Sequence, residues 1–176
     1  MKFSIQLKTP RLTLFGADEV ILDAAISGRN ALQAALDIEV PGEWPPEHLD
    51  SPALEWMKRL LNKLPNETPW RMYLIVLDTH PQILIGTCGF KGPPDANGEV
   101  EIGYGVLPDF QRNGYASEAS RALADIAFSQ GARHVAAESF PELVASLGVM
   151  RKCGMVHCGS GSEAGTVRYR VSAPLA

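Results

Sequence analysis

Three apolar segments, separated only by short turn-forming stretches, constrain the fold of this chain more than any other feature. They are residues 71–78 (RMYLIVLD), 83–91 (ILIGTCGFK) and 98–107 (GEVEIGYGVL), with THPQ and GPPDANG between them. Short runs rich in β-branched and aromatic residues and bounded by Pro and Gly are typical of strands joined by hairpins. We therefore expect an antiparallel meander in the middle of the chain.

Helical periodicity flanks this meander. After it, apolar residues recur from Tyr115 onward at the spacing of one helix face, and Gly131 stands where a C-terminal cap belongs. The other expected elements, in chain order, are a strand over 11–17, helical segments over 17–35 and 53–64, a strand over 133–140, a helix over 141–154 and a strand over 166–175.

This order predicts an α/β (α+β) fold, with a mixed, mostly antiparallel sheet of six to seven strands and helices on both faces. The 176 residues suffice for one hydrophobic core and are too few for two comfortable ones, so a single domain over 1–176 is expected. Neither an internal repeat nor a linker interrupts the sequence.

Composition excludes several classes of protein. Apolar residues make up 45% of the chain, and its net charge of −4 argues against a general nucleic-acid binder. No apolar stretch is long enough to span a bilayer, and no leader is recognisable, so we expect a cytoplasmic protein without a membrane partner, either a monomer or a homodimer. The cysteines Cys88, Cys153 and Cys158 lack ligand spacing, which predicts free thiols and no metal site.

A polar loop, LPDFQRNGYASEAS (107–120), joins the last strand of the meander to the helix that follows. A helix N-terminus in this place offers unpaired N–H groups to an anion, and Gly114 has no side chain to block the approach. Taken alone, the loop favours a tight turn whose small residues only pack, which is the commoner explanation for a strand-Gly-helix junction.

QRNGYA (111–116) resembles the Q/R-x-x-G-x-G/A signature of the GNAT superfamily of acyl-CoA-dependent N-acyltransferases. The likeness is strongest over 101–119 and 133–155, and the opening TPRLTLFGA (9–17) is similar to the branch that includes ribosomal-protein N-terminal acetyltransferases. The resemblance implies the acyl-CoA N-acyltransferase fold, in which the strand at 98–107 splays from the strand at 133–140. It also implies acetyl-CoA as co-substrate and no metal.

The resemblance further implies how acetyl-CoA is held. The backbone amides from about Arg112 to Ala116 cradle the pyrophosphate, and the pantetheine arm lies along the splayed strand. The residues implied to bind it are Val106, Leu107, Gln111, Arg112, Asn113, Gly114, Tyr115 and Ala116. The chain departs from the family pattern P-E-N-x-x-S at PELVAS (141–146), where Leu143 replaces an Asn that often hydrogen-bonds the cofactor and Ser146 is kept.

Acetyl transfer to an amine needs a base for the ammonium and an acid for the leaving thiolate. Alternation along 98–107 puts Glu101 on the same side as Gly103 and Gly105, in a semi-buried cleft where desolvation favours proton uptake. Glu101 is therefore the candidate base, with the alternative that it only pairs with Arg168 or Arg170.

Residues 141–155 contain no tyrosine, the residue that protonates the thiolate in some relatives. Ser146 is the available hydroxyl there, and it either donates to the thiolate or is an ordinary polar residue near a helix start.

We therefore predict an N-acetyltransferase that transfers acetyl from acetyl-CoA to a primary amine by direct attack. The acceptor is a protein or peptide N-terminus or a small-molecule amine. Trp44, Trp56, Trp70 and, with less support, His48 fall in the expected acceptor region, although each tryptophan could equally be core. The alternative, motivated by Leu143 and the missing tyrosine, is a non-catalytic CoA-binding or protein-interaction module on the same fold.

Overall fold

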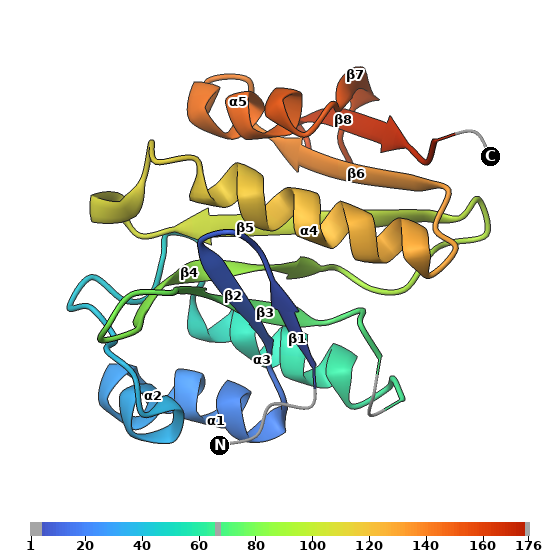
Figure 1. Ribbon diagram of the computed structural model, residues 1–176. Helices are drawn as coiled ribbons and strands as arrows, with labels where there is room; N and C mark the ends of the chain where they lie inside the picture. The colour runs from blue at the N-terminus through green and yellow to red at the C-terminus, as the bar shows by residue number, and fades with distance from the viewer. Residues whose placement is uncertain (1–4, 66–67, 175–176) are drawn as a thin grey trace.

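The computed structural model describes residues 5–65 and 68–174 and contains one eight-stranded sheet (Figure 1). The strands lie in the order β1-β2-β3-β4-β5-β6-β8-β7, and every neighbouring pair is antiparallel except β5 and β6. Their bounds are β1 Gln6–Lys8, β2 Leu12–Gly16, β3 Met72–Leu77, β4 Ile83–Phe90, β5 Glu99–Val106, β6 His134–Ser139, β7 Val156–Ser160 and β8 Val167–Ser172. The predicted mixed, mostly antiparallel sheet is confirmed.

Two of these strands were not predicted, so the expected count of six to seven is too low. Strand β1 has only three residues, too few to show an alternating pattern. Strand β7 is an edge strand whose residues are mostly exposed, and it therefore lacks an apolar face in the sequence.

Five α-helices cover the sheet: α1 Glu19–Ser27, α2 Arg29–Leu36, α3 Ser51–Leu61, α4 Tyr115–Ser129 and α5 Val144–Lys152. The single helical stretch expected over 17–35 is wrong. Gly28, at φ 109°, ends α1 and donates its N–H to the carbonyls of Ala24 and Ala25 before α2 begins. Glycine adopts positive φ without strain, so a helix that contains it can end and restart there. None of the helices in the described ranges is long and apolar enough to cross a membrane.

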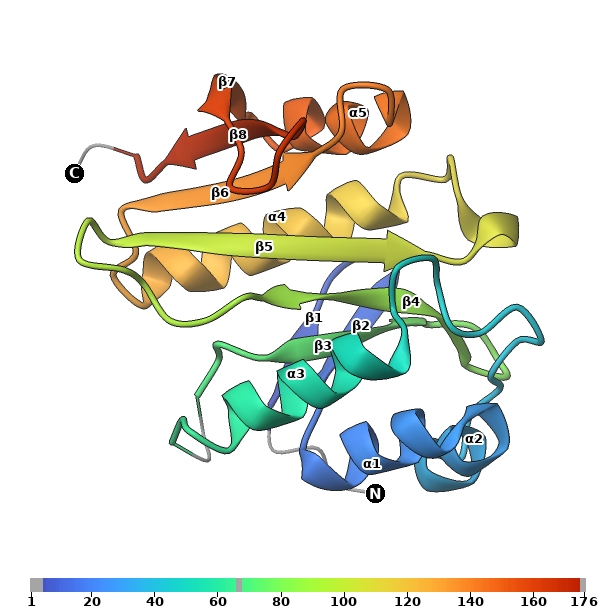
Figure 2. The same cartoon turned by 180° about the vertical axis from the view of Figure 1, so that it is seen from behind.

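Helices pack on both faces of the sheet, as predicted. Helices α4 and α5 lie over one face (Figure 1), and α1, α2 and α3 gather over β2, β3 and β4 on the other (Figure 2). On that second face no helix of the described chain lies over β5, β6 and β8 (Figure 2). This face, which carries loops but no helix and lies on the side of Glu101, is called the open face below.

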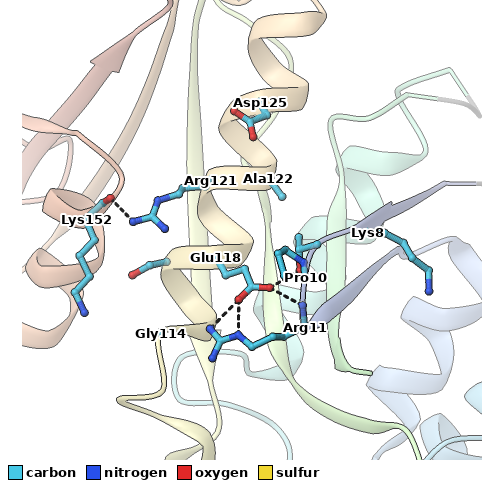
Figure 3. Close-up of a pocket in the computed structure, with 11 residues that line it drawn as sticks. Lys8, Pro10, Arg11, Gly114, Glu118, Arg121, Ala122, Asp125 and Lys152 are labelled. Atoms are coloured by element: carbon cyan, nitrogen blue, oxygen red, sulfur yellow. Dashed lines mark hydrogen bonds and ion pairs between the residues drawn. The ribbon is translucent and has the colours of Figure 1, made fainter. Parts of the chain in front are cut away.

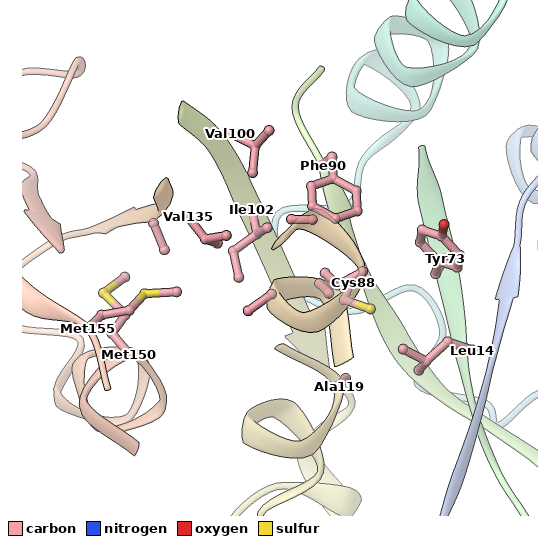
Figure 4. Packing of buried hydrophobic residues seen from close by; sticks show 14 of the residues in the cluster. Leu14, Tyr73, Cys88, Phe90, Val100, Ile102, Ala119, Val135, Met150 and Met155 are labelled. Carbon is pink, nitrogen blue, oxygen red and sulfur yellow. The ribbon is translucent and has the colours of Figure 1, made fainter. Parts of the chain in front are cut away.

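Strand β3 explains the apolar run in the sequence, because both of its faces are buried. Tyr73 and Ile75 join the core beneath α4, together with Cys88, Ile102 and Ala119 (Figure 4). The alternate residues of β3 join the second core with α1–α3: Met72, Leu74 and Val76.

Candidate functional site

Strands β5 and β6 pair only at their beginning and then diverge. The parallel register runs from Glu99↔His134 to Glu101↔Ala136. Beyond it, β5 continues to pair with β4 up to Val106, and β6 continues to pair with β8 up to Ser139. The predicted splay is therefore present, and Glu101 stands at the last paired position.

The loop that follows β5 leads directly into α4. A 3-10 turn, η1 (Pro108–Phe110), comes first, and the amide side chain of Gln111 folds back to donate to the Val106 carbonyl (2.9 Å). Arg112 (φ 64°) and Gly114 (φ 83°) both adopt the left-handed conformation. Non-glycine residues in that conformation are uncommon and cluster at functional sites.

The backbone amides of this loop are free to bind a ligand. In the described part of the chain, no hydrogen bond uses the N–H groups from Arg112 to Ala116. Gly114 is the N-cap of α4 and offers no side-chain acceptor to the first turn. The positive end of the α4 dipole and unpaired amides of this kind favour an anion over a cation.

Arg11, in the turn between β1 and β2, braces the loop from outside. Its guanidinium donates to the Asn113 carbonyl (3.0 Å) and to Glu118 Oε2 (2.7 Å), and it lies over the Tyr115 ring at 4.5 Å. Glu118 also accepts from the Thr9 hydroxyl (2.6 Å). The N-terminal hairpin and the first turn of α4 are thus held together.

A pocket of about 570 Å³ opens beside this brace (Figure 3). Four cationic side chains and two acidic ones line it: Lys8, Arg11, Arg121 and Lys152, with Glu118 and Asp125. Gly114 lies at its edge, so the free amides of the loop and a cationic pocket adjoin each other.

An ion-pair network occupies the open face. Arg168 of β8 contacts Glu99 Oε1 (2.6 Å), Glu101 Oε2 (3.2 Å) and Glu138. The Lys91 ammonium contacts Glu101 Oε1. The register places these carboxylates and Arg168 on the same face of β5, β6 and β8, so Glu101 lies between two cations.

Charges in this network stabilise one another. Burial alone lowers the pKa of Arg168, but the carboxylates of Glu99 and Glu138 outweigh it and raise the pKa. Burial raises the pKa of Glu138, but two kinds of contact oppose it. The Ser162 amide and hydroxyl, both at 2.8 Å, and Arg168 together bring the pKa of Glu138 below its usual range. Both shifts favour the charged forms of Arg168 and Glu138.

Ser146 lies on the opposite side of β5, in the first turn of α5. The Tyr104 hydroxyl donates to the Ser146 carbonyl (3.0 Å), and the two hydroxyl oxygens are 3.3 Å apart. Burial raises the pKa of Tyr104 to about 12, with the hydrogen bond to Ser146 opposing it. Glu101 and Ser146 therefore flank the divergence from its two faces.

Comparison with known proteins assigns the chain to a family. The family model described as Acetyltransferase (GNAT) domain matches residues 27–156, well over half of the chain. The chain is a member of the GNAT acetyltransferase family. The uncharacterized N-acetyltransferase YjdG of Bacillus subtilis (strain 168) is 33% identical to it over 126 residues, 72% of this chain and 74% of the relative. This GNAT protein is an acetyl-CoA-dependent acetyltransferase.

Solved structures share the fold at low sequence identity. The ribosomal-protein-S5-alanine acetyltransferase from Vibrio fischeri superposes with a TM-score of 0.69 at 14% identity, covering 96% of each chain. The ribosomal L7/L12 alpha-N-protein acetyltransferase in complex with coenzyme A gives a TM-score of 0.66 at 20% identity, covering 96% of this chain and 98% of the other.

The structure places three residues singled out in the sequence as follows. Leu143, in place of the family Asn, is the N-cap of α5, makes no side-chain cap and is 43% exposed. Glu101 pairs with Arg168, which is the alternative that the sequence left open. Glu101 also stands where β5 and β6 separate. Leu107 is fully buried, and its N–H donates to Ile85 (2.9 Å).

Residues of the expected acceptor region fall in different environments. Trp44 is buried with α1–α3, Trp70 packs edge-on against Phe90, and Trp56 is 42% exposed. His48 is exposed beside Glu47. Within the described ranges, no group of His, Cys, Asp or Glu side chains could hold a metal ion.

Sequence reasoning missed the side chains that support the site: Thr9, Arg11, Lys91, Glu118 and Glu138. Arg11 meets Glu118 across 107 residues of chain, a contact that no local pattern reveals. The one available signal was the resemblance of residues 9–17 to a family branch, which includes both Thr9 and Arg11.

Proposed function

We propose that this GNAT protein is an N-acetyltransferase that transfers the acetyl group of acetyl-CoA to a primary amine by direct attack in a ternary complex. The observation that carries the proposal is the divergence of β5 from β6, with Glu101 at its apex and an amide-bearing loop at the end of β5. In this proposal, Glu101 near the start of β5 is the base, and the loop at the end of β5 binds the phosphates.

The residues around the loop fit the phosphates of coenzyme A. The free amides of Arg112 to Ala116 can donate to the pyrophosphate, and Gly114 leaves the backbone accessible. A Cβ at Gly114 would stand 3.5 Å from Arg11 Nη2, the nearest atom. The cationic pocket beside it would accept the remaining phosphate, because phosphates favour arginine and lysine.

The pantetheine arm would lie along β5 as an added strand. Backbone groups alternate along a strand, and those of Glu101 and Leu107 bond toward β4, to Lys91 and Ile85. The groups of Ile102 and Tyr104 therefore point toward the divergence, where amides of the arm can pair with them. The half-buried side chain of Val106 would supply contact at the phosphate end, whereas Leu107, fully buried, would support the strand from within the core.

In this proposal the two flanking residues move the protons. Glu101 accepts a proton from the acceptor ammonium, which frees the nitrogen lone pair to attack the thioester carbonyl. The carbon–sulfur bond then breaks, and the Ser146 hydroxyl donates a proton to the leaving thiolate. The attacking nitrogen loses its second proton to water, and water in turn reprotonates Ser146, so that the products are a neutral amide and a free thiol. Tyr104, hydrogen-bonded to the Ser146 carbonyl, positions that turn of α5.

The direct test measures thiol release from acetyl-CoA across a panel of primary amines and short peptides with free N-termini. Turnover with at least one amine, and an acetylated amine product by mass spectrometry, is expected. If coenzyme A binds but no amine in the panel is acetylated, direct transfer to a primary amine is rejected.

The panel should include protein N-termini as well as small amines. Two structural neighbours are ribosomal-protein acetyltransferases by name, and the name of one of them supports testing peptides that begin with alanine. The same peptides with a blocked N-terminus and a free lysine distinguish α-amine from side-chain acetylation.

A further inference from the structure

The two cations on Glu101 are held very differently. Arg168 has a 23% exposed side chain and spans three carboxylates on β5 and β6. Lys91 has a 53% exposed side chain, and within the described residues its ammonium contacts only Glu101. Because Lys91 is half exposed and holds one carboxylate, whereas Arg168 holds three, Lys91 is the partner that can leave at the lower cost.

Each cation faces a different oxygen of Glu101. Oε2 faces Arg168, and Oε1 faces Lys91. Oε1 is buried and accepts no hydrogen bond from the described residues. Among those residues, the cation in contact with Oε1 is the ammonium of Lys91. An acceptor that arrives as an ammonium must therefore reach Oε1 to give up its proton.

Deepening the proposed function, on which this inference rests, we propose that Lys91 occupies the place of the acceptor's amine on Glu101 and must move aside for the acceptor to bind. Lys91 thus determines acceptor affinity and leaves the chemical step unchanged. The acceptor ammonium replaces the lysine ammonium, and the charge on Glu101 stays balanced throughout.

The surroundings of Lys91 allow this exchange. Its backbone is fixed, because its N–H donates to the Glu101 carbonyl (2.8 Å), whereas its four-carbon side chain can rotate. A pocket of about 250 Å³ lies beside it, lined in part by Gly92, Asp95 and Glu99. Asp95 is held by the backbone amides of its own turn and offers the displaced ammonium a second carboxylate.

The test compares Lys91→Met with wild type in steady-state kinetics using a primary amine that is turned over. KM for the amine is expected to fall on the order of two- to fivefold, with kcat changed less than twofold. Lys91→Arg, which keeps a cation on Glu101, should restore the wild-type KM. Unchanged or increased KM in Lys91→Met would overturn the proposal.

Arg170→Met is the matched control for a general charge effect. Arg170 contributes a positive charge to the same face and contacts Glu99 at 3.5 Å, with no contact to Glu101. If Arg170→Met lowers KM as much as Lys91→Met does, net charge explains the result and the proposal is wrong.

A binding measurement separates this proposal from the proposed function. NMR titration with n-butylammonium chloride, with n-butanol as the uncharged probe, reports occupancy beside Glu101 without turnover. The Kd for n-butylammonium is expected to be two- to fivefold lower in Lys91→Met than in wild type. Equal affinities would reject the role of Lys91 even if the enzyme is active, and tighter binding would support it even if no amine is turned over.

Discussion

At the residue scale, position distinguishes Glu101 from the neighbouring carboxylate of Glu99. Glu99 and Glu101 lie two positions apart on one face and share Arg168. Only Glu101 stands at the last pair before β5 and β6 separate, and the ammonium of Lys91 contacts Glu101 and not Glu99.

Replacing Glu101 with glutamine is expected to lower kcat/KM for the amine by at least about 100-fold, because a neutral amide cannot accept the proton. Thiol release with a competent amine measures the effect. Glu99→Gln, which removes a neighbouring carboxylate, should cost less than tenfold. Activity in Glu101→Gln that equals wild type would show that another group is the base.

Gly114→Asp is expected to weaken coenzyme A binding by at least about 100-fold, because a carboxylate would face the pyrophosphate at close range. Isothermal calorimetry measures the affinity. Gly131→Asp is the control, since Gly131 has a similar φ of 86° at the other end of α4, and a Cβ added there would meet no described atom within 4 Å. Unaltered affinity in folded Gly114→Asp would reject the loop as the phosphate site.

The candidate residues that the sequence predicted are those whose position follows from local periodicity. Glu101 could be placed on the glycine side of its strand, and Gly114 at the start of a helix, before any tertiary contact was known. Lys91 could not be linked to Glu101 in this way, since their contact depends on how the hairpin turns back. The choice between Arg168 and Arg170 required the register of β8, which the sequence does not reveal.

At the element scale, the contact between the N-terminal hairpin and α4 fixes the loop. Burial alone raises the pKa of Glu118, but hydrogen bonds from Thr9 and Arg11 outweigh it and lower the pKa below its usual value. The carboxylate is therefore more stable in the folded protein than in the unfolded chain.

Glu118→Gln is expected to lower the free energy of unfolding at pH 7 by about 1–3 kcal/mol, the value of charged hydrogen bonds. The stabilisation is complete above the unfolded-state pKa of about 4.3 and disappears as pH falls through the lower folded-state value. Urea denaturation at pH 7 and pH 3 should therefore show a difference between variant and wild type that shrinks in acid.

Glu55→Gln is the control for this measurement. Glu55 pairs with Arg59 at 3.7 Å on the surface of α3, and both side chains are more than half exposed. Its loss should cost less than about 0.5 kcal/mol. A difference for Glu118→Gln that is equally small would mean that the brace adds little to stability.

Elements with strong apolar patterns were predicted and those without one were missed. The three central strands and α4 bury whole faces, so their periodicity identifies them. Strand β7, exposed along most of its length, forms because it can pair with β8, and a partner cannot be read from the strand itself. Gly28 itself is the sequence signal for the break between α1 and α2. The helical periodicity on both sides of it led to the prediction of one continuous helix.

At the scale of the whole molecule, coenzyme A would bind across the divergence and contact both parts of the sheet. A ligand that binds only the folded state stabilises it by about 2.7 kcal/mol at 100 times its Kd. For a chain of 176 residues, this corresponds to a rise in Tm of about 5–10 °C. Differential scanning fluorimetry measures it, and Gly114→Asp should show almost no shift. A full shift in that variant would contradict binding at the loop.

The position of the divergence has a consequence for solubility. Unpaired strand edges are a common cause of aggregation, because they accept strands from other molecules. Here the unpaired edges of β5 and β6 face each other in the middle of an eight-stranded sheet, with α4 and α5 behind them. The outer boundaries of the sheet are instead the short β1 and the exposed β7. The unpaired N–H and C=O groups of β5 and β6 can therefore pair with one extended ligand, and strands from other copies of the protein cannot easily reach them.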